Sequence, residues 1–241
     1  MGEYLILKLT VLAFLFSTGS ILTLKPLALK IGLTDKPCAR KHHQGHIPLV
    51  GGIAVFFSIG MALLSYGQLS QFNFAFLLAA SLLVLIGVID DYKCIHIVPR
   101  FMMQIIASLI MVYLGDVRIS NLGNLLGFGE IQLDLFSVPF TVFAVVGGIN
   151  AFNMIDGIDG LAGSLSLVIF MIVAALCDTS AFFNITLLSL IFIAAIAGFL
   201  LFNLRFFGRK ASVFLGDTGS TLFGFSICWF LITASQGEFR V

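Results

Sequence analysis

Carboxylates at the ends of long apolar runs are the residues of this sequence that most need a chemical explanation. Asp90 and Asp91 end one such run, and Asp217 lies between two glycines at the start of the last one. An Asp at the centre of a bilayer costs roughly 2.5–3.5 kcal/mol even on a lenient insertion scale. One Asp alone is well explained as a solvated helix end, but several together predict a site that handles cations or phosphate groups.

A second polar group is spaced three residues apart, at Asn150, Asn153, Asp156 and Asp159. Positions three apart share one face of a helix, so a helical segment here would carry a polar stripe. Asn and Gly are also common where membrane helices pack together, but two carboxylates favour a functional stripe. A glycine follows each Asp, which permits close approach of a ligand and could also break the helix.

The segment Phe214-Leu-Gly-Asp217-Thr-Gly-Ser220 resembles an anion or metal site. Backbone N–H groups at a helix start favour phosphate, whereas Asp217 repels it unless a cation lies between them. Mg²⁺ accepts one or two carboxylates together with waters and substrate phosphates. We therefore predict Mg²⁺ at this position, with Mn²⁺ as the alternative.

Basic residues provide the opposite charge. Lys41 and His46 lie in the basic segment 36–48, and Arg100 lies at a predicted helix start. Arg pairs well with phosphate. The histidines of this segment are poorly spaced for zinc and have no suitably spaced Cys partner, so phosphate binding is the better interpretation. The general excess of Lys and Arg in cytoplasmic loops of membrane proteins explains the basic segment equally well.

The composition predicts that lipid surrounds most of the chain. Hydrophobic residues make up 59% and charged residues 10%, against about 25% charged residues in soluble domains. A net charge of +1 offers no field to attract nucleic acid. The four cysteines are isolated and are expected to be reduced and structural. We predict an all-α polytopic membrane bundle, with residues 1–241 as one domain and about eight spans, near 4–24, 49–69, 74–89, 101–115, 135–149, 163–177, 183–203 and 218–235.

The Lys and Arg residues predict the orientation. If the loop that begins at Lys25 faces the cytoplasm, ten of the thirteen Lys and Arg residues fall on that side. The first span is then a retained helix that begins in the periplasm, because it has no basic leader and no cleavage site. All five Asp residues named above fall on the same cytoplasmic side. This convergence is independent of the basic residues that defined the topology.

The sequence resembles the polyprenyl-phosphate N-acetylhexosamine-1-phosphate transferases in three motifs. They are the Asp90-Asp91 pair, the Asn-x-x-Asn-x-x-Asp-Gly-x-Asp-Gly segment that begins at Asn150 and the Phe-x-Gly-Asp segment that ends at Asp217. The three motifs occur in the order of that family, and the resemblance covers the whole chain. The segment from His46 to Gly52 looks closest to bacterial members that use UDP-N-acetylglucosamine and undecaprenyl phosphate. Phospho-MurNAc-pentapeptide translocase is the nearer alternative and fits this segment less well.

The resemblance implies a Mg²⁺-dependent enzyme of the bacterial inner membrane that transfers N-acetylglucosamine 1-phosphate to undecaprenyl phosphate and releases UMP. This reaction begins the synthesis of enterobacterial common antigen and of O-antigen lipopolysaccharide. The site it implies comprises a catalytic set of Asp90, Asp91, Asp156 and Asp159, a metal set of Asp217, Asn153 and Asp156, a nucleotide set of Phe214, Asp159 and Asn150, and a phosphate set of Arg100, Lys41 and His46.

Family members are expected to continue beyond the equivalent of Val241, into further spans and a loop rich in His and Arg that helps to hold the nucleotide sugar. We therefore expect this chain to be a C-terminally short member, and an inactive remnant remains an alternative. An ion-coupled transporter is the competing class, since intramembrane carboxylates also mark ion pathways. The five carboxylates at one predicted surface argue against it, because a proton relay should thread the bilayer.

Overall fold

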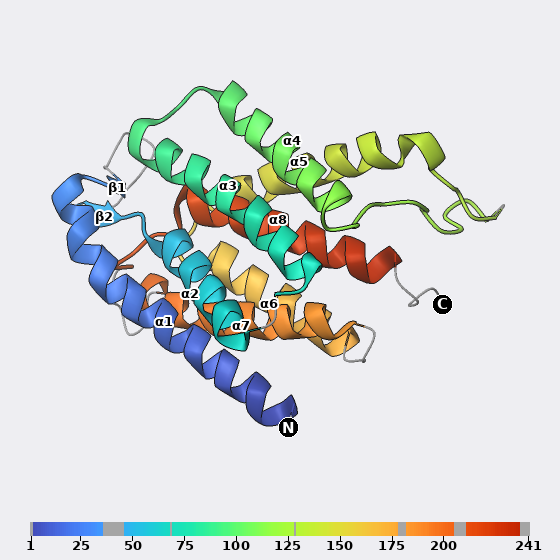
Figure 1. The fold of residues 1–241 in the computed structure, drawn as a ribbon. Helices are drawn as coiled ribbons and strands as arrows, with labels where there is room; N and C mark the ends of the chain where they lie inside the picture. Colours follow the sequence, from blue (N-terminus) through green and yellow to red (C-terminus); the bar gives the residue numbers. More distant parts are fainter. Residues whose placement is uncertain are drawn as a thin grey trace.

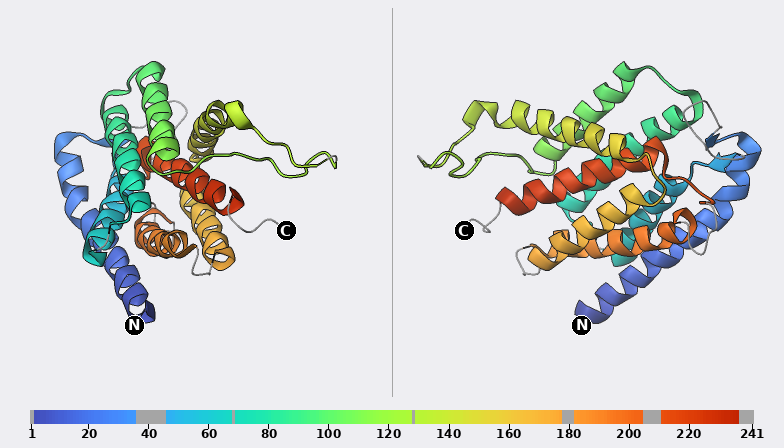
Figure 2. Two further views of the ribbon diagram at one scale, coloured as in Figure 1. Left: turned by 45° about the vertical axis from the view of Figure 1, so that its right-hand side comes forward. Right: turned by 180° about the vertical axis from the view of Figure 1, so that it is seen from behind.

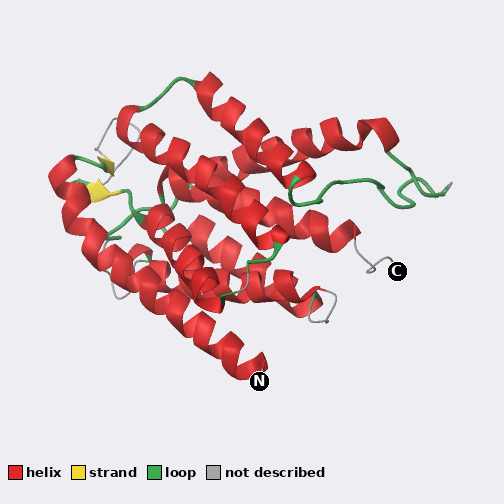
Figure 3. Ribbon diagram, in the orientation of Figure 1, coloured by secondary structure: helices red, strands yellow, loops and turns green. Residues whose placement is uncertain are grey.

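A computed structural model of the chain describes residues 2–35, 46–67, 69–127, 129–177, 182–204 and 211–236. Within these ranges the chain forms eight α-helices, one 3-10 turn and one two-stranded sheet (Figures 1 and 3). The elements are α1 (Gly2–Ile31), β1 (Thr34–Asp35), β2 (Ile47–Pro48), α2 (Gly51–Tyr66), α3 (Gln71–Lys93), α4 (Ile97–Tyr113), η1 (Asp134–Phe136), α5 (Ser137–Ile155), α6 (Leu161–Leu176), α7 (Phe183–Asn203) and α8 (Gly216–Gln236).

Each of the eight predicted apolar runs forms one of these helices. Five of the described helices, α1, α3, α5, α7 and α8, are long and apolar enough to cross a membrane. The other three, α2, α4 and α6, are apolar but only 16 or 17 residues long. The expected all-α polytopic architecture is confirmed, and the three short helices need flanking residues to reach across about 30 Å of hydrocarbon.

The first helix is longer than the sequence predicted. It continues through Pro26 to Ile31, so Lys25 and Lys30 lie on its last turns rather than in a loop. A proline removes one backbone hydrogen bond from a helix but does not always end it. The basic residues at 36–45 and 205–210, which also supported the predicted orientation, lie outside the described residues.

The helix α8 lies near the middle of the bundle, where Figure 2 shows it between α3 and α6. In the most apolar stretch of 18 residues of each helix, 72% of the stretch is buried in α8, 67% in α7 and 22% in α1. Helices α2, α3, α5 and α6 all contact α8. The helix that carries Asp217 is therefore among the best-enclosed elements of the described chain.

Glycines allow two helices to approach the start of α8 closely. A Cβ atom on Gly52 of α2 would lie 2.3 Å from the backbone nitrogen of Gly219, and one on Gly87 of α3 would lie 2.5 Å from Cα of Thr218. Small residues are typical of such close contacts between membrane helices. Any larger residue at Gly52 or Gly87 would push α2 or α3 away from the first turn of α8.

Backbone pairing fixes the segment that leads into α8. Strand β1 pairs antiparallel with β2, and the chain then runs beside residues 214 and 215. Phe214 donates its N–H to Pro48 O at 2.9 Å, while Gly51 and Gly52 donate to the carbonyls of Phe214 and Leu215, both at 3.0 Å. The start of α2 thus anchors the Phe-Leu-Gly-Asp segment through its own backbone N–H groups, which have no partner within the helix.

Candidate active site

Four helices bring their polar ends together at one end of the bundle, on the left in Figure 1. Asp90 and Asp91 lie near the end of α3, Arg100 on the first turn of α4, Asn153 near the end of α5 and Asp217 on the first turn of α8. We call this the site end. Consecutive helices run in alternate directions, so the ends of odd-numbered helices meet the starts of even-numbered ones here.

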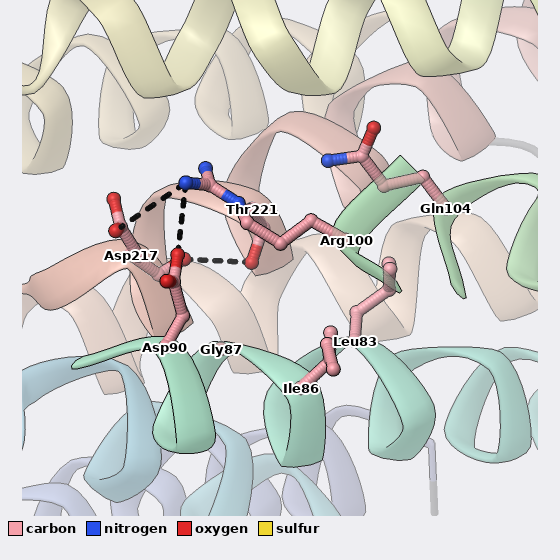
Figure 4. Close-up of a pocket in the computed structure, with 8 residues that line it drawn as sticks. All are labelled: Leu83, Ile86, Gly87, Asp90, Arg100, Gln104, Asp217 and Thr221. Carbon is pink, nitrogen blue, oxygen red and sulfur yellow. Dashed lines mark hydrogen bonds and ion pairs between the residues drawn. The ribbon is translucent and has the colours of Figure 1, made fainter. Parts of the chain in front are cut away.

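Asp90 and Arg100 form the central ion pair of this site (Figure 4). The Arg100 Nη1 atom lies 2.9 Å from Oδ2 of Asp90, whose side chain is only 5% exposed. The other carboxylate oxygen, Oδ1, accepts the N–H of Ile95 at 3.0 Å and so holds the turn between α3 and α4. A buried carboxylate requires such a paired cation, because a lone charge there is costly.

Arg100 also lies near Asp217. Its Nη1 atom is 4.0 Å from Oδ2 of Asp217, whose side chain is 39% exposed. Two carboxylates thus lie within 4.0 Å of the same guanidinium nitrogen. Leu83, Ile86, Gly87, Gln104 and Thr221 complete the lining of a cavity of about 10 Å³ between these charges. A space of this size holds about one water molecule.

Asn153 joins α5 to the first turn of α8. Its side-chain nitrogen donates to Oδ1 of Asp217 and to the hydroxyl oxygen of Ser220, each at 2.7 Å. Thr221 in turn donates its hydroxyl to the backbone carbonyl of Asp217 at 2.7 Å. The structure therefore brings together Asn153 and Asp217, two of the three predicted metal ligands, and the amide oxygen of Asn153 remains an acceptor beside the carboxylate.

Asp91 faces the start of α8. Its Oδ1 accepts the backbone N–H of Asp217 at 2.8 Å, and its Oδ2 accepts the backbone N–H and the hydroxyl of Thr218 at 3.1 and 2.6 Å. Adjacent residues on a helix point in different directions. The two carboxylates of the pair therefore lie in different surroundings, with Asp90 at the cavity and Asp91 against the backbone of α8.

The predicted polar stripe is helical only in its first half. Helix α5 ends at Ile155, so Asn150 and Asn153 are helical, whereas Asp156 caps the helix and Asp159 lies in the following turn. Gly160 has a φ of +79°, a value that favours glycine. The glycines break the helix before a continuous stripe of four side chains can form.

Asn203 is a buried residue that sequence reasoning did not identify. Its Oδ1 accepts the N–H of Gly160 at 2.8 Å, and its Nδ2 donates to Val213 O at 2.9 Å. One side chain, 5% exposed, therefore ties the turn that contains Asp159 to the segment that contains Phe214. The available signal was a single amide at the end of an apolar span, a position where a buried polar group needs partners.

Asn150 points away from this turn. Its side-chain nitrogen donates to Oε1 of Gln104 at 2.7 Å and to Val146 O at 2.8 Å. Gln104 is 2% exposed and lines the cavity beside Arg100. Sequence reasoning also missed Gln104, which the spacing of four residues places one helical turn after Arg100.

The structure describes two of the three predicted phosphate ligands, and one of these, His46, is not part of this cluster. His46 is exposed, and its Nδ1 atom lies 3.5 Å from the hydroxyl of Thr34 at the β1–β2 pair. Lys41 lies outside the described residues. Among the predicted phosphate ligands that the structure describes, Arg100 is the one in contact with the carboxylates.

An apolar groove lies between α4 and α5 and ends at Asn150. Its volume is about 570 Å³. The residues that line it are Phe101, Ile105, Leu109, Val138, Pro139, Val142, Phe143, Val146, Gly147 and Asn150. The hydrogen bond between Asn150 and Gln104 connects this groove to the small polar cavity.

The oxygen ligands present fit a divalent cation such as Mg²⁺. Within the described ranges, no three His, Cys, Asp or Glu residues are arranged so that they could hold a metal ion on their own, but Mg²⁺ requires only one or two carboxylates with waters and substrate phosphates. Asp90 is already paired with Arg100, so Asp217 and the amide oxygen of Asn153 are the better candidates to hold it. The thiol groups of the described cysteines, Cys94, Cys177 and Cys228, are unpaired by disulfides.

Comparison of the sequence with known proteins identifies the family of this chain. The sequence pattern of glycosyl transferase family 4 matches residues 73–235. Proteins described as undecaprenyl-phosphate alpha-N-acetylglucosaminyl 1-phosphate transferases are similar to the chain: 41% identical in Yersinia pestis, 39% in Escherichia coli K12 and 39% in Haemophilus influenzae. Each alignment covers 93% of this chain.

The chain spans only part of these relatives, namely 62%, 61% and 64% of their lengths in the same order. The family pattern nevertheless includes α3, α4, α5 and α8 and thus the four helices that supply Asp90, Arg100, Asn153 and Asp217. On the match over residues 73–235, this chain is a member of glycosyl transferase family 4.

Proposed function

We propose that this chain carries the catalytic centre of a sugar-1-phosphate transferase, which moves N-acetylglucosamine 1-phosphate from UDP-N-acetylglucosamine to undecaprenyl phosphate. The observation that carries the proposal is the cluster of Asp90, Arg100, Asn153 and Asp217 at one end of a membrane bundle. Relatives about 40% identical bear the name of this activity. We further propose that this reaction begins the synthesis of O-antigen and of enterobacterial common antigen.

The reaction needs few proton transfers. A phosphate oxygen of the lipid forms a bond to the β-phosphorus of the nucleotide sugar, and the bond between that phosphorus and the oxygen of UMP breaks with its electron pair. A phosphate monoester has its second pKa near 6, so the acceptor is largely deprotonated at about pH 7 without a strong base. Phosphoryl transfer then depends on positioning and charge neutralisation.

The residues divide these tasks. Asp217 and Asn153 would hold Mg²⁺, or Mn²⁺, which when bound offsets the charge of the phosphates. Arg100 binds a phosphate oxygen while Asp90 keeps its guanidinium in place at 2.9 Å. Phe214 and Asp159 belong to segments that Asn203 ties together, and we propose that they bind the uracil, with Asp156 nearby on the same turn.

The lipid acceptor has a matching surface in the groove between α4 and α5. A polyprenyl chain is apolar and needs an apolar surface open to the bilayer, and its phosphate needs a polar end to that surface. Asn150 and Gln104 lie where the groove meets the cavity with Arg100. We propose that Asn150 serves the acceptor lipid here rather than the nucleotide.

The substrate supply argues for the location. Nucleotide sugars are made in the cytoplasm, so the site end would face the cytoplasm across the inner membrane, in agreement with the orientation expected from Lys and Arg.

Membranes that contain the full chain can test the proposal with labelled UDP-N-acetylglucosamine, undecaprenyl phosphate and Mg²⁺. We expect label in the lipid phase and an equal amount of UMP, both abolished by a chelator and by Asp217→Asn. The matched control is Asp116→Asn, at an exposed residue beyond α4 whose φ of +53° Asn tolerates. Absence of both products from folded protein would refute the proposed activity.

A further inference from the structure

We propose that Asp91 is a positioning residue that caps the N-terminus of α8 and thereby holds Asp217, while Asp90 alone of the pair faces the reacting groups. The effect on turnover rests on the proposed function, but the capping role itself does not.

The carboxylate of Asp91 is fully engaged by the first turn of α8. It accepts the N–H groups of Asp217 and Thr218, at 2.8 and 3.1 Å, and the Thr218 hydroxyl at 2.6 Å. The first N–H groups of a helix have no partner within it, and a negative charge there is favoured by the helix dipole. Both carboxylate oxygens are therefore committed to one helix end.

The segment before α8 has no side chain that could perform this role. N-caps are usually Ser, Thr, Asp or Asn, whose side-chain oxygen accepts the free N–H groups. Here Leu215 and Gly216 stand at the start of α8, and neither carries an acceptor. Because Thr218 is fully buried, water cannot reach its N–H, and Asp91 of α3 supplies the acceptor instead.

Gly216 is adapted to this contact. A Cβ atom on Gly216 would lie 2.6 Å from Oδ2 of Asp91, and the residue has a φ of +76°. Gly87 makes a comparable approach, since its Cβ would lie 2.5 Å from Cα of Thr218. The absence of side chains at both positions lets α3 come close enough to α8 for a carboxylate to reach the backbone.

The cap controls where Asp217 lies. Asp217 and Ser220 share the first turn of α8, and Asn153 binds both side chains at 2.7 Å. If this turn frays, the Asp217 carboxylate moves relative to Asn153 and Arg100. Asp91 therefore acts through Asp217, without touching the substrate.

Hydrogen exchange of the whole chain in detergent tests the cap without any need for activity. In Asp91→Leu we expect the amides of residues 217 and 218 to exchange at least about tenfold faster than in the wild type. In Asp91→Asn the remaining oxygen can still accept from Asp217, so the amide of residue 217 should exchange within about threefold of the wild-type rate, whereas the amide of residue 218 loses its acceptor. The control Asp90→Asn should leave these two amides within about twofold of the wild type. Wild-type exchange in Asp91→Leu, or equal acceleration in Asp90→Asn, would overturn the proposal.

If Asp91→Leu does not fold, a second comparison, between single and double variants of Asp91 and Thr218, still tests the cap. In Asp91→Asn the amide nitrogen faces the Thr218 hydroxyl, which can rotate to accept it. Adding Thr218→Val removes this partner, so the double variant should exchange faster than the two single variants combined predict. Additive effects would contradict a cap shared between Asp91 and Thr218.

Measurements of kcat and KM distinguish a positioning role of Asp91 from a direct role in the reaction. Asp91→Asn should keep at least about a tenth of kcat, with the KM for UDP-N-acetylglucosamine within about twofold of the wild type. Asp91→Leu should lose about 100-fold in kcat and need more Mg²⁺ for half-maximal rate. If Asp91→Asn is as inactive as Asp91→Leu despite its milder exchange, the charge of Asp91 serves the reaction and the positioning role is wrong. If the wild type transfers no sugar phosphate, the proposed function fails while exchange still decides the cap.

Discussion

The side-chain nitrogen of Asn153 lies 2.7 Å from Oδ1 of Asp217, so the end of α5 is tied directly to the start of α8. These residues are 64 positions apart in the chain and belong to two different motifs. The hydrogen bond makes the two motifs parts of one site and leaves the amide oxygen of Asn153 beside the carboxylate.

Replacement of Asn153 by Ala should lower kcat by about 100-fold, because it removes both a proposed metal ligand and the hydrogen bond that orients Asp217. Ser220→Ala removes only a second acceptor of the same amide, so we expect a loss of about tenfold or less. Steady-state rates over a range of Mg²⁺ concentrations provide the measurement. Equal losses in the two variants would contradict a special role for Asn153.

Arg100→Gln should destabilise the protein by about 1–3 kcal/mol, because the buried Asp90 carboxylate loses its paired cation. It should also reduce kcat by at least about 100-fold through loss of the proposed contact between Arg100 and a substrate phosphate. The double variant Arg100→Gln with Asp90→Asn should recover stability but not activity. Thermal unfolding in detergent and a transfer assay separate the two effects, and recovery of activity would refute phosphate binding by Arg100.

Asn203→Leu leaves the Gly160 N–H and the Val213 carbonyl without their partner, so we expect a loss of roughly 2–4 kcal/mol in unfolding free energy. The Asn203 side chain ties together the two segments proposed to bind uracil. Its loss should therefore also raise the KM for UDP-N-acetylglucosamine by about tenfold.

The control for this prediction is Gln236→Leu at the other end of the bundle. Gln236 accepts from the Ser120 N–H at 3.0 Å and hydroxyl at 2.9 Å, and it donates to Asn121 O at 3.0 Å. Its loss should lower stability and leave KM unchanged. A similar rise in KM in both variants would show that Asn203 affects the nucleotide only through general stability.

Gly147→Leu should fill the groove between α4 and α5 and raise the KM for undecaprenyl phosphate by about tenfold, with little change for the nucleotide sugar. No atom lies within 4 Å of a Cβ built on Gly147, so the fold should tolerate the change. Gly60→Leu on α2 is the matched control, because the space around its Cβ is equally open. An unchanged acceptor KM in Gly147→Leu would exclude this groove as the lipid site.

Much of the fold was predictable because a helix that crosses a membrane needs a run of about 20 mainly apolar residues. Every predicted apolar run forms a helix, and the carboxylates Asp90, Asp156 and Asp217 lie at or near ends of α3, α5 and α8. Helix lengths near charged or glycine-rich boundaries were less predictable. α1 continues past Lys25 and Pro26, because a helix can tolerate a charged side chain or one lost backbone bond near its end.

The partners of individual polar side chains were not predictable from spacing. Asp90 and Asp91 are adjacent and chemically identical, but one pairs with Arg100 and the other with the backbone of α8. Asn150 and Asn153 share one helix, but one contacts Gln104 and the other Asp217. Asn203 carried no motif and still joins two of the motif segments.

The sequence by itself determined the membrane class, the helices, the family resemblance and the residues that gather at one end, since these follow from local hydrophobicity, charge and motif order. Only the tertiary structure decided which side chains meet. That outcome depends on the rotation of each helix about its axis and on the closeness that glycines such as Gly52 and Gly87 permit at the start of α8. These contacts join residues far apart in the chain, and no local periodicity encodes them.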